Sequence, residues 1–287
     1  MKKLIVTADD FGLTERVNEA ICKCFREGIV TTASLMTSGA AFDSAVEIAR
    51  NNPELDVGIH LNLTEGQDFA YRHPAKLAIA LLLGQVSSGD LEKTIRGQIE
   101  KALLTGLPIT HIDGHKHVHA IPTVRRIIER VGPEYGVHAI RSVVESVPSL
   151  PGLLRRNPGS RRRILLQYGF GRALSAIWRT TATGPVRFYG ITQTGFLDEI
   201  SFTEIIDDLR DGIHEVMCHP GYVDDALKKT PTRLLYQRER EVRLLTAPRI
   251  KQMLEERNII LGSYRDLVQN TGTTNLWKRQ PRFVTPS

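Results

Sequence analysis

Short apolar runs alternate with helical segments along most of this 287-residue chain. The first run, Leu4–Thr7, is bounded by charge and reads as a short buried strand, followed by a turn at Asp9–Gly12. Thr14 can cap the helix that comes next, and Gly28 can end it. The same succession recurs, with strands expected at 33–36, 56–63, 108–113, 139–141, 215–218 and 259–261 and helices at 41–51, 91–104 and 122–131. This alternation predicts an α/β fold with a mostly parallel sheet.

Conspicuous polar residues lie at the carboxyl ends of the expected strands, namely Asp9, Asp10, His60, His115 and His219. In β/α barrels the active site is built from several strand ends at that face. The chain has neither a G-x-G-x-x-G turn after a strand nor a P-loop, which argues against a dinucleotide-binding sheet. We therefore expect a single-domain TIM-like β/α barrel, complete or distorted, over residues 1–268. An Arg-rich insertion would lie at about 150–190 and a polar tail at 269–287.

Cysteine usage and the lack of long apolar stretches indicate the compartment. Cys22, Cys24 and Cys218 make an odd number without a pairing pattern, which favours a reducing compartment over a disulfide framework. A C-x-C metal site at Cys22 and Cys24 is a less favoured alternative. The N-terminal apolar run is too short for a signal peptide, and no stretch reaches the roughly 18 apolar residues that span a bilayer. We expect a cytoplasmic protein.

The segment 111–119 carries the strongest chemical signal in the chain. Its side chains of interest recur at every second position: His111, Asp113, His115, His117 and His119. In an extended chain all five would project to one face. Imidazole and carboxylate together suit a divalent transition metal or a mixed site. Because the row is too long for one ion to use all of it, we expect one or two metal ligands, with the others lining a pocket.

The other polar residues are ambiguous when each is taken alone. Asp9 and Asp10 repel each other if buried, and a bound metal would offset that charge, but such a pair is also typical of a surface turn. His60 lies within an apolar strand, where a histidine is commonly structural. His219 precedes a Pro-Gly turn that would expose its imidazole, which suits either a general acid or a structural histidine. Their shared position at strand ends favours one joint site.

Five motifs follow one another along the chain: Leu4–Leu13, Gly58–Leu61, Thr110–His119, Met217–Pro220 and Leu261–Leu267. Taken together, they resemble the motifs of the YdjC-like carbohydrate deacetylases and run in that family's order from residue 3 to about 268. Within the family, Val6–Gly12, Thr32–Met36 and the Arg-rich middle are more similar to the hopanoid-biosynthesis-associated branch than to the chitooligosaccharide branch.

The resemblance implies a TIM-like barrel that binds one divalent metal ion, Mg²⁺ or Zn²⁺. It carries over the family's site residues as metal ligands Asp10, His60 and His115, general base Asp9, general acid His219, and residues near substrate His117 and Arg141. The implied activity is metal-dependent removal of an acetyl group from an N-acetylated amino sugar. In the hopanoid branch that sugar would be N-acetylglucosaminyl hopanoid, a lipid.

Residues 151–190 contain eight arginines and no acidic residue, interleaved with leucines and Trp178. This pattern favours a basic amphipathic helix that lies on an anionic membrane surface, which would place the protein at the inner face of the membrane. A solvated basic helix that covers the barrel explains the pattern equally well. Nucleic-acid binding is disfavoured, because no recognised module accompanies the charge.

Other functions stay open on the sequence alone. The substrate could be a soluble chitooligosaccharide, or the same ligands could serve another metal-dependent hydrolase such as a phosphoesterase or amidohydrolase, for which a two-metal cluster would be expected. A sugar-binding barrel without turnover is a further alternative, against which Asp9 and His219 argue. The identity of the metal and the formation of a homodimer are likewise undetermined.

Overall fold

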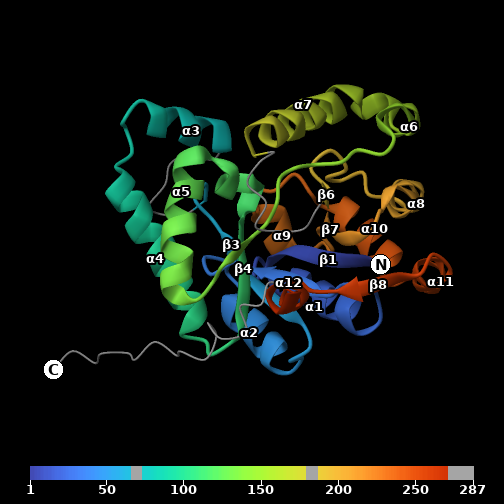
Figure 1. Ribbon diagram of the computed structural model, residues 1–287, viewed down its shortest axis with the longest axis horizontal. Coiled ribbons are helices and arrows are strands. Elements are labelled where there is room, and N and C mark those ends of the chain that lie inside the picture. The colour runs from blue at the N-terminus through green and yellow to red at the C-terminus, as the bar shows by residue number, and fades with distance from the viewer. Residues whose placement is uncertain (66–72, 179–186, 271–287) are drawn as a thin grey trace.

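The computed structural model of the chain describes residues 1–65, 73–178 and 187–270. The polar tail that the sequence predicts falls, from residue 271 onward, outside the described residues. Over the rest, the predicted α/β architecture is confirmed: a parallel sheet is surrounded by helices (Figure 1).

The described strands form an eight-stranded sheet in which every pairing is parallel. They are β1 (Lys2–Phe11), β2 (Thr32–Leu35), β3 (Asp56–Leu61), β4 (Ile109–Gly114), β5 (Ala139–Ile140), β6 (Arg187–Tyr189), β7 (Gly212–Cys218) and β8 (Ile259–Gly262). The order is β5-β4-β3-β2-β1-β7-β6, and β8 also pairs with β1. An isolated parallel bridge between Glu145 and Phe188 joins the chain after β5 to β6. The result is a distorted β/α barrel.

Twelve α-helices are described around this sheet (Figure 1). They are α1 (Glu15–Arg26), α2 (Phe42–Arg50), α3 (Pro74–Leu82), α4 (Ser88–Leu103), α5 (Pro122–Val131), α6 (Leu150–Arg156), α7 (Arg161–Trp178), α8 (Glu199–Asp208), α9 (Asp225–Lys229), α10 (Tyr236–Leu245), α11 (Pro248–Glu256) and α12 (Tyr264–Asn270). Three 3-10 turns, η1 (His115–Ala120), η2 (Gly132–Tyr135) and η3 (Pro158–Ser160), complete the described elements. None of these helices is both long and apolar enough to cross a bilayer.

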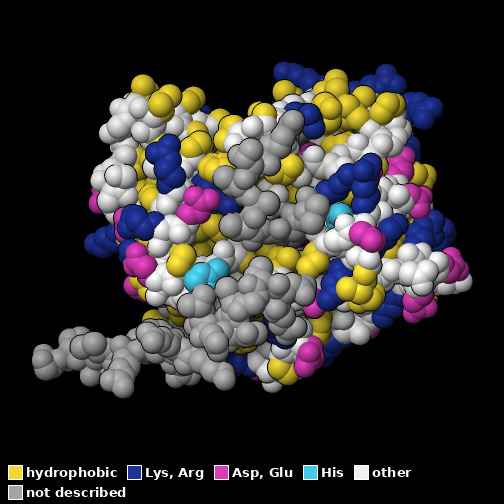
Figure 2. Space-filling model, in the orientation of Figure 1, with side chains coloured by type: hydrophobic (Ala, Val, Ile, Leu, Met, Phe, Trp, Pro, Cys, Tyr) yellow, Lys and Arg dark blue, Asp and Glu magenta, His cyan; other side chains and the backbone are white. Residues whose placement is uncertain are grey.

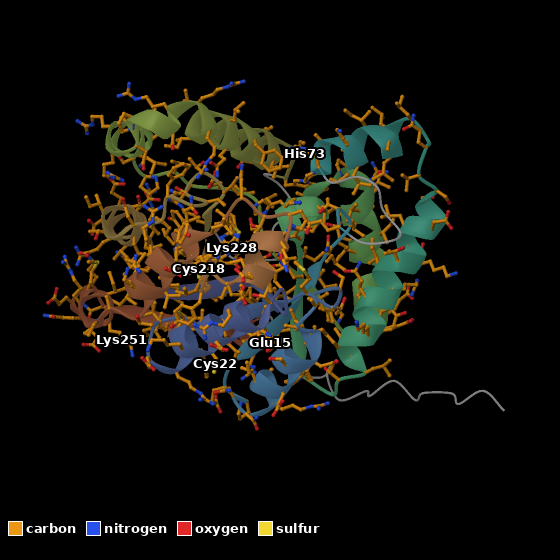
Figure 3. All side chains as sticks on the ribbon, turned by 180° about the vertical axis from the view of Figure 1, so that it is seen from behind. Glu15, Cys22, His73, Cys218, Lys228 and Lys251 are labelled. Atoms are coloured by element: carbon orange, nitrogen blue, oxygen red, sulfur yellow. The ribbon has the colours of Figure 1, made fainter. Side chains whose placement is uncertain are left out.

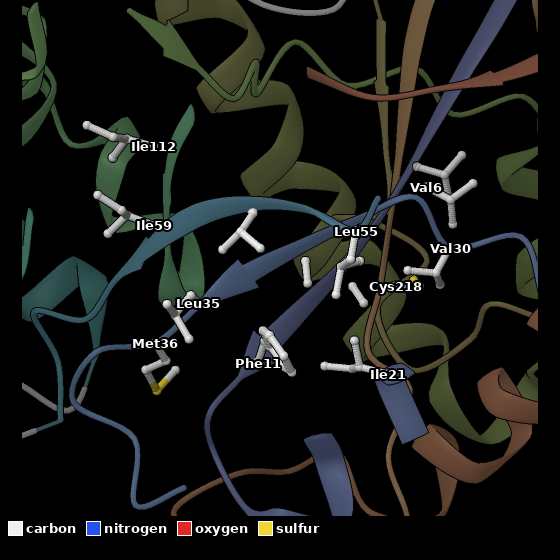
Figure 4. Packing of buried hydrophobic residues seen from close by; sticks show 14 of the residues in the cluster. Val6, Phe11, Ile21, Val30, Leu35, Met36, Leu55, Ile59, Ile112 and Cys218 are labelled. Carbon is white, nitrogen blue, oxygen red and sulfur yellow. The ribbon is translucent and has the colours of Figure 1, made fainter. Parts of the chain in front are cut away.

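Local sequence explains how the first helix is fixed against the sheet. The Thr14 side chain accepts a hydrogen bond from the Val17 backbone N–H, which is the predicted N-cap. Ile21 and Cys24 lie on the buried stripe of this helix, and Figure 4 shows Ile21 beside Phe11 of β1. Burying this stripe holds α1 on β1 and so keeps the carboxyl end of the strand in place.

Two of the three cysteines are buried. Cys22, Cys24 and Cys218 are all free thiols, and Cys218 lies on β7 (Figure 3). Burial raises the pKa of the Cys24 thiol to about 12, which keeps it protonated and disfavours the C-x-C metal alternative.

Candidate active site

Asp9 and Asp10 reach the same site because β1 contains a bulge at its carboxyl end. Ala8 pairs with Ala33 but Phe11 pairs with Leu35, so β1 has one more residue than β2 over this stretch. Adjacent strand residues normally point to opposite faces, and a bulge re-aims them. Asp10 adopts the left-handed region, with φ 69°, which aspartate tolerates better than most residues. The turn expected at residues 9–12 is therefore wrong for 9–11, which remain in the strand.

The structure brings together the three residues that the sequence assigns as metal ligands. Asp10, His60 and His115 offer ligand atoms that all lie within 4.8 Å of one another. The Asp10 Oδ1 atom is 3.0 Å from His115 Nδ1 and 3.5 Å from His60 Nε2. These residues come from the ends of β1 and β3 and from the start of η1. Two imidazoles and one carboxylate form a donor set that suits a catalytic divalent cation.

A buried carboxylate lies behind His60. The His60 Nδ1 atom is 2.7 Å from Asp113 Oδ1, which leaves Nε2 facing Asp10. Histidines that bind metals commonly hold their second nitrogen against a carboxylate, which fixes the tautomer and raises ligand basicity. On the other side, the His115 Nε2 atom lies 3.5 Å from Glu65 Oε1. These contacts make the donor set a good fit for one divalent cation.

The carboxylates of the site are balanced by protons on histidine and by arginines. Burial lowers the pKa of His60, but the carboxylates of Asp113 and Asp9 outweigh it and raise this pKa to about 10. Burial alone would raise the pKa of Asp10, yet Arg238 of α10 and His115 hold it well below its usual range. A cation at this site would therefore displace a proton from His60.

Arg141 fills the space between the site's other carboxylates. It has no exposed surface and binds Asp9 through two hydrogen bonds of 2.9 and 2.7 Å. Its guanidinium also lies 2.6 Å from Asp113 Oδ2 and 3.0 Å from Glu215 Oε1. Asp9, His60 and Asp113 form a second group with metal-ligand spacing, but the Arg141 guanidinium already bridges its two carboxylates. This arrangement favours one metal over a two-metal cluster.

The burial of Arg141 does not fit the substrate contact that the sequence predicts for it. Arg141 lies directly after β5, and its guanidinium is enclosed by Asp9, Asp113 and Glu215. A buried carboxylate resists ionisation unless a cation pairs with it. Burial raises the pKa of Asp9, and Arg141 opposes that rise without cancelling it. Arg141 thus orients Asp9 and favours its ionised form, which is the form that can accept a proton.

His219 follows β7 and is half-buried. Its backbone N–H donates a hydrogen bond of 2.5 Å to Glu241 Oε2 on α10. Burial holds the pKa of the His219 imidazole well below its usual value, so the ring is neutral near neutral pH. Burial also raises the pKa of the Glu241 carboxyl to about 7. One helix therefore holds two parts of the site, because Arg238 binds Asp10 and Glu241 binds the backbone of His219.

The alternating side chains of residues 111–119 would share one face only in an extended chain, and the chain is extended only to Gly114. Pairing of β4 with β3 ends at Gly114, and the chain then turns into η1 with left-handed backbone at Lys116 and His117. Without a neighbouring strand, nothing holds the chain extended. Among the described residues of the row, His115 joins Asp10 and His60 as a candidate ligand, and Asp113 contacts His60 from behind. His117 packs 6.0 Å from the Phe188 ring, while His111 stacks on Tyr264 and His119 is fully buried.

Several contributors to the site were not predicted: Asp113 behind His60, Glu215 and Arg238 as ion-pair partners, and Glu241 behind His219. Asp113 carries a sequence signal, since it belongs to the alternating row. Arg238 and Glu241 carry none, because the charge-rich stretch Tyr236–Leu245 is typical of a solvent-exposed helix.

Comparison with known proteins agrees with this geometry. The family model for YdjC-like proteins matches residues 3–256. The chain belongs to the YdjC-like family. A carbohydrate deacetylase from Brevibacillus brevis is 33% identical over 274 residues, covering 92% of this chain and 99% of that protein. A chitooligosaccharide deacetylase from Yersinia enterocolitica is 31% identical over 279 residues, covering 92% of this chain and 99% of that protein.

The distorted barrel is also found in a solved structure. A crystal structure of a protein from Enterococcus faecalis V583, named for cellobiose-phosphate cleavage, superimposes with a TM-score of 0.70. It is 22% identical in sequence and covers 93% of this YdjC-like chain and 98% of its own. At this identity the likeness shows a shared fold.

Proposed function

We propose that this YdjC-like protein is a metal-dependent deacetylase, a hydrolase that releases acetate from an N-acetylated amino sugar. The observation that carries the proposal is the Asp10–His60–His115 group at the strand ends, with Asp9 beside it. Relatives named as carbohydrate deacetylases match nearly the whole chain, which supports the same reaction class.

We assign the reaction steps to residues of this chain. A divalent cation held by Asp10, His60 and His115 would polarise the acetyl carbonyl and lower the pKa of a water molecule. Asp9 accepts the proton of the attacking water, and its carboxylate keeps lone pairs for this while bound to Arg141. His219 is neutral before the attack. The proton that Asp9 takes from the water would therefore pass to the His219 imidazole, which would donate it to the departing amine.

The attack forms a carbon–oxygen bond and breaks the amide carbon–nitrogen bond. The products are acetate and a free amino sugar. Arg141 acts through Asp9 as a positioning residue in this scheme, and Asp113 acts through His60. His117 would line the substrate pocket beside His115, since it lies in the same turn η1.

We further propose a lipid-linked sugar, N-acetylglucosaminyl hopanoid, in preference to a soluble chitooligosaccharide. Support comes from Val6–Gly12 and Thr32–Met36, the motifs that resemble the hopanoid-associated branch, and from the Arg-rich stretch. Residues 150–178 of that stretch form α6, η3 and α7. A soluble chitooligosaccharide remains the alternative, since it is the substrate for which the Yersinia relative is named.

Acetate release tests the function and the substrate together. Metal-loaded protein is incubated with N-acetylglucosaminyl hopanoid in detergent and, in parallel, with diacetylchitobiose. Release from the lipid supports both proposals, and release from the soluble sugar alone supports deacetylation but contradicts the lipid substrate. Release from neither, with bound metal verified by elemental analysis, contradicts the proposed function.

Two variants separate metal binding from proton transfer. Asp9→Asn should abolish turnover and keep the metal, whereas His115→Ala should lose both, because of these two residues only His115 is assigned as a metal ligand. Glu255→Gln, an exposed carboxylate on α11, is the matched control and should change neither. A metal-free Asp9→Asn protein alongside a metal-loaded His115→Ala protein would reverse the assigned roles.

A further inference from the structure

Exposed apolar side chains gather on two helices, α3 and α7. They are Ile79, Leu82 and Leu83 at α3, and Leu165, Leu166, Phe170 and Ile177 on α7. Leu82 is 85% exposed, Leu83 63% and Leu166 65%. Figure 2 shows yellow side chains along the edge that α3 and α7 form in Figure 1, and the reverse view in Figure 3 places both helices at that edge. We call these seven residues the α3–α7 surface. Apolar surface of this kind commonly marks an interaction site.

Both helices border the turn that carries the proposed metal ligand His115. On one side, α3 packs against η1. On the other, the ring of Phe170 in α7 lies 6.4 Å from the ring of His117 in η1. Phe170 is also 40% exposed, so it links the surroundings of the site to the protein surface. The α3–α7 surface therefore lies at the same end of the barrel as the candidate active site.

The charged side chains that α3 and residues 151–190 contribute are all basic. Arg155, Arg161, Arg162 and Arg172 are exposed, and residues 151–190 contain no acidic residue. The neighbouring arginines serve the fold instead, since Arg156 binds Glu204 and Arg163 lies over the Phe196 ring. In α3, Lys76 is the only charged residue and it is exposed. The surface thus combines apolar side chains with positive charge.

We propose that the α3–α7 surface docks on an anionic lipid bilayer, with the site end of the barrel turned towards the membrane. Apolar side chains would enter the boundary between headgroups and acyl chains, and the arginines would meet anionic headgroups. A second copy of the chain is a poorer occupant, because a twofold contact through this patch would bring like charges together. The proposal rests on the proposed function in one respect: the docked site would face a sugar carried by a lipid.

Vesicle sedimentation tests the docking with the full chain. Phosphatidylcholine vesicles, with and without phosphatidylglycerol, are mixed with protein at low and at physiological salt. Binding should require phosphatidylglycerol and weaken with salt. Leu82→Ser with Leu83→Ser should weaken it at least about tenfold through lost insertion. Arg161→Gln with Arg162→Gln should weaken it by about tenfold or more, since each basic residue contributes to attraction by anionic lipid.

Ile200→Ser with Ile260→Ser is the matched control, because both residues are exposed but lie on α8 and β8. Equal loss of binding in this control would overturn the proposal. So would the absence of sedimentation with phosphatidylglycerol vesicles at low salt. A solution dimer that Leu82→Ser with Leu83→Ser dissociates would also overturn it, by showing that a second copy covers the surface.

Acetate release in detergent separates this proposal from the proposed function, since micellar substrate needs no bilayer. Leu82→Ser with Leu83→Ser should release acetate from the micellar lipid at the wild-type rate. If the wild type releases acetate but does not sediment, docking fails and the deacetylase function stands. If it sediments on anionic vesicles but releases no acetate, docking stands and the function fails.

Discussion

Replacing Asp113 by Asn tests whether the carboxylate behind His60 supports a metal centre. Asp113 has no exposed surface, and its Oδ1 atom lies 2.7 Å from His60 Nδ1. Its Oδ2 atom accepts a hydrogen bond of 2.7 Å from Ser34 and lies 2.6 Å from the Arg141 guanidinium. Asparagine keeps the shape of the side chain but carries no charge. His60 would then lose the charged acceptor that raises its basicity.

The expected size of the effect follows from two opposing changes. Loss of such a carboxylate typically weakens metal binding by about 10- to 100-fold, or about 1.4 to 2.7 kcal/mol. Asp113 also contributes to the raised His60 pKa of about 10, so at neutral pH a cation must displace a proton from His60. The substitution lowers that pKa and relieves the competition. The loss of affinity should therefore be nearer to tenfold at about pH 7 and larger at about pH 9.

Competition with a metal-binding dye at both pH values measures this directly. Wild-type affinity should rise steeply with pH, and the Asp113→Asn affinity should rise less. Glu255→Gln serves as the control for a lost carboxylate, and near-ultraviolet circular dichroism verifies folding, since Arg141 also loses a partner. An Asp113→Asn protein with wild-type affinity and wild-type pH dependence would refute the assignment of His60 as a ligand oriented by Asp113.

Three further predictions concern stability and the metal. Arg141→Met removes the arginine that pairs with three buried carboxylates and should lower the free energy of unfolding by about 3 to 5 kcal/mol. The control Arg155→Met, at an exposed arginine, should change it little. A loss below about 1 kcal/mol for Arg141→Met in urea titrations would contradict the prediction. Burial raises the pKa of Glu145 to about 7, so the stability it contributes is fully present below its ordinary pKa of 4.5 and is lost as pH rises through 7. Between about pH 4.5 and about pH 7, this carboxyl should make the free energy of unfolding fall by on the order of 3 kcal/mol, and Glu145→Gln should remove that fall. Urea titrations at the two pH values measure it, and a variant with the wild-type pH dependence would contradict the prediction. Dialysis against a chelator should abolish acetate release and lower the melting temperature, with both restored by Zn²⁺ or Mg²⁺; full activity in verified metal-free protein would exclude the proposed chemistry.

The barrel and the general position of the site could be predicted because they rest on local patterns. Apolar runs such as Leu4–Thr7 and the spacing of apolar residues after Thr14 define strands and helices within short windows. Parallel strands place their carboxyl ends at one face, so the strand ends that carry Asp10 and His60 are expected at the same end of the barrel. The short strand β6 escaped prediction because three residues inside an Arg-rich stretch carry too little pattern.

Contacts between distant segments were decided by the tertiary structure alone. The register of β1 against β2 creates the bulge that turns Asp9 and Asp10 to one site, and neither strand shows it by itself. The end of β4 pairing at Gly114 breaks the expected row of histidines.

The sequence by itself thus determined the succession of strands and helices and the residues at the strand ends, since hydrophobic periodicity acts over a few residues. Only the tertiary structure decided which charges meet: that Arg141 is enclosed by carboxylates, and that Arg238 of α10 reaches Asp10, 228 positions earlier in the chain. The reason is physical. A buried charge must be paired, and its partner is set by packing, which no local pattern encodes.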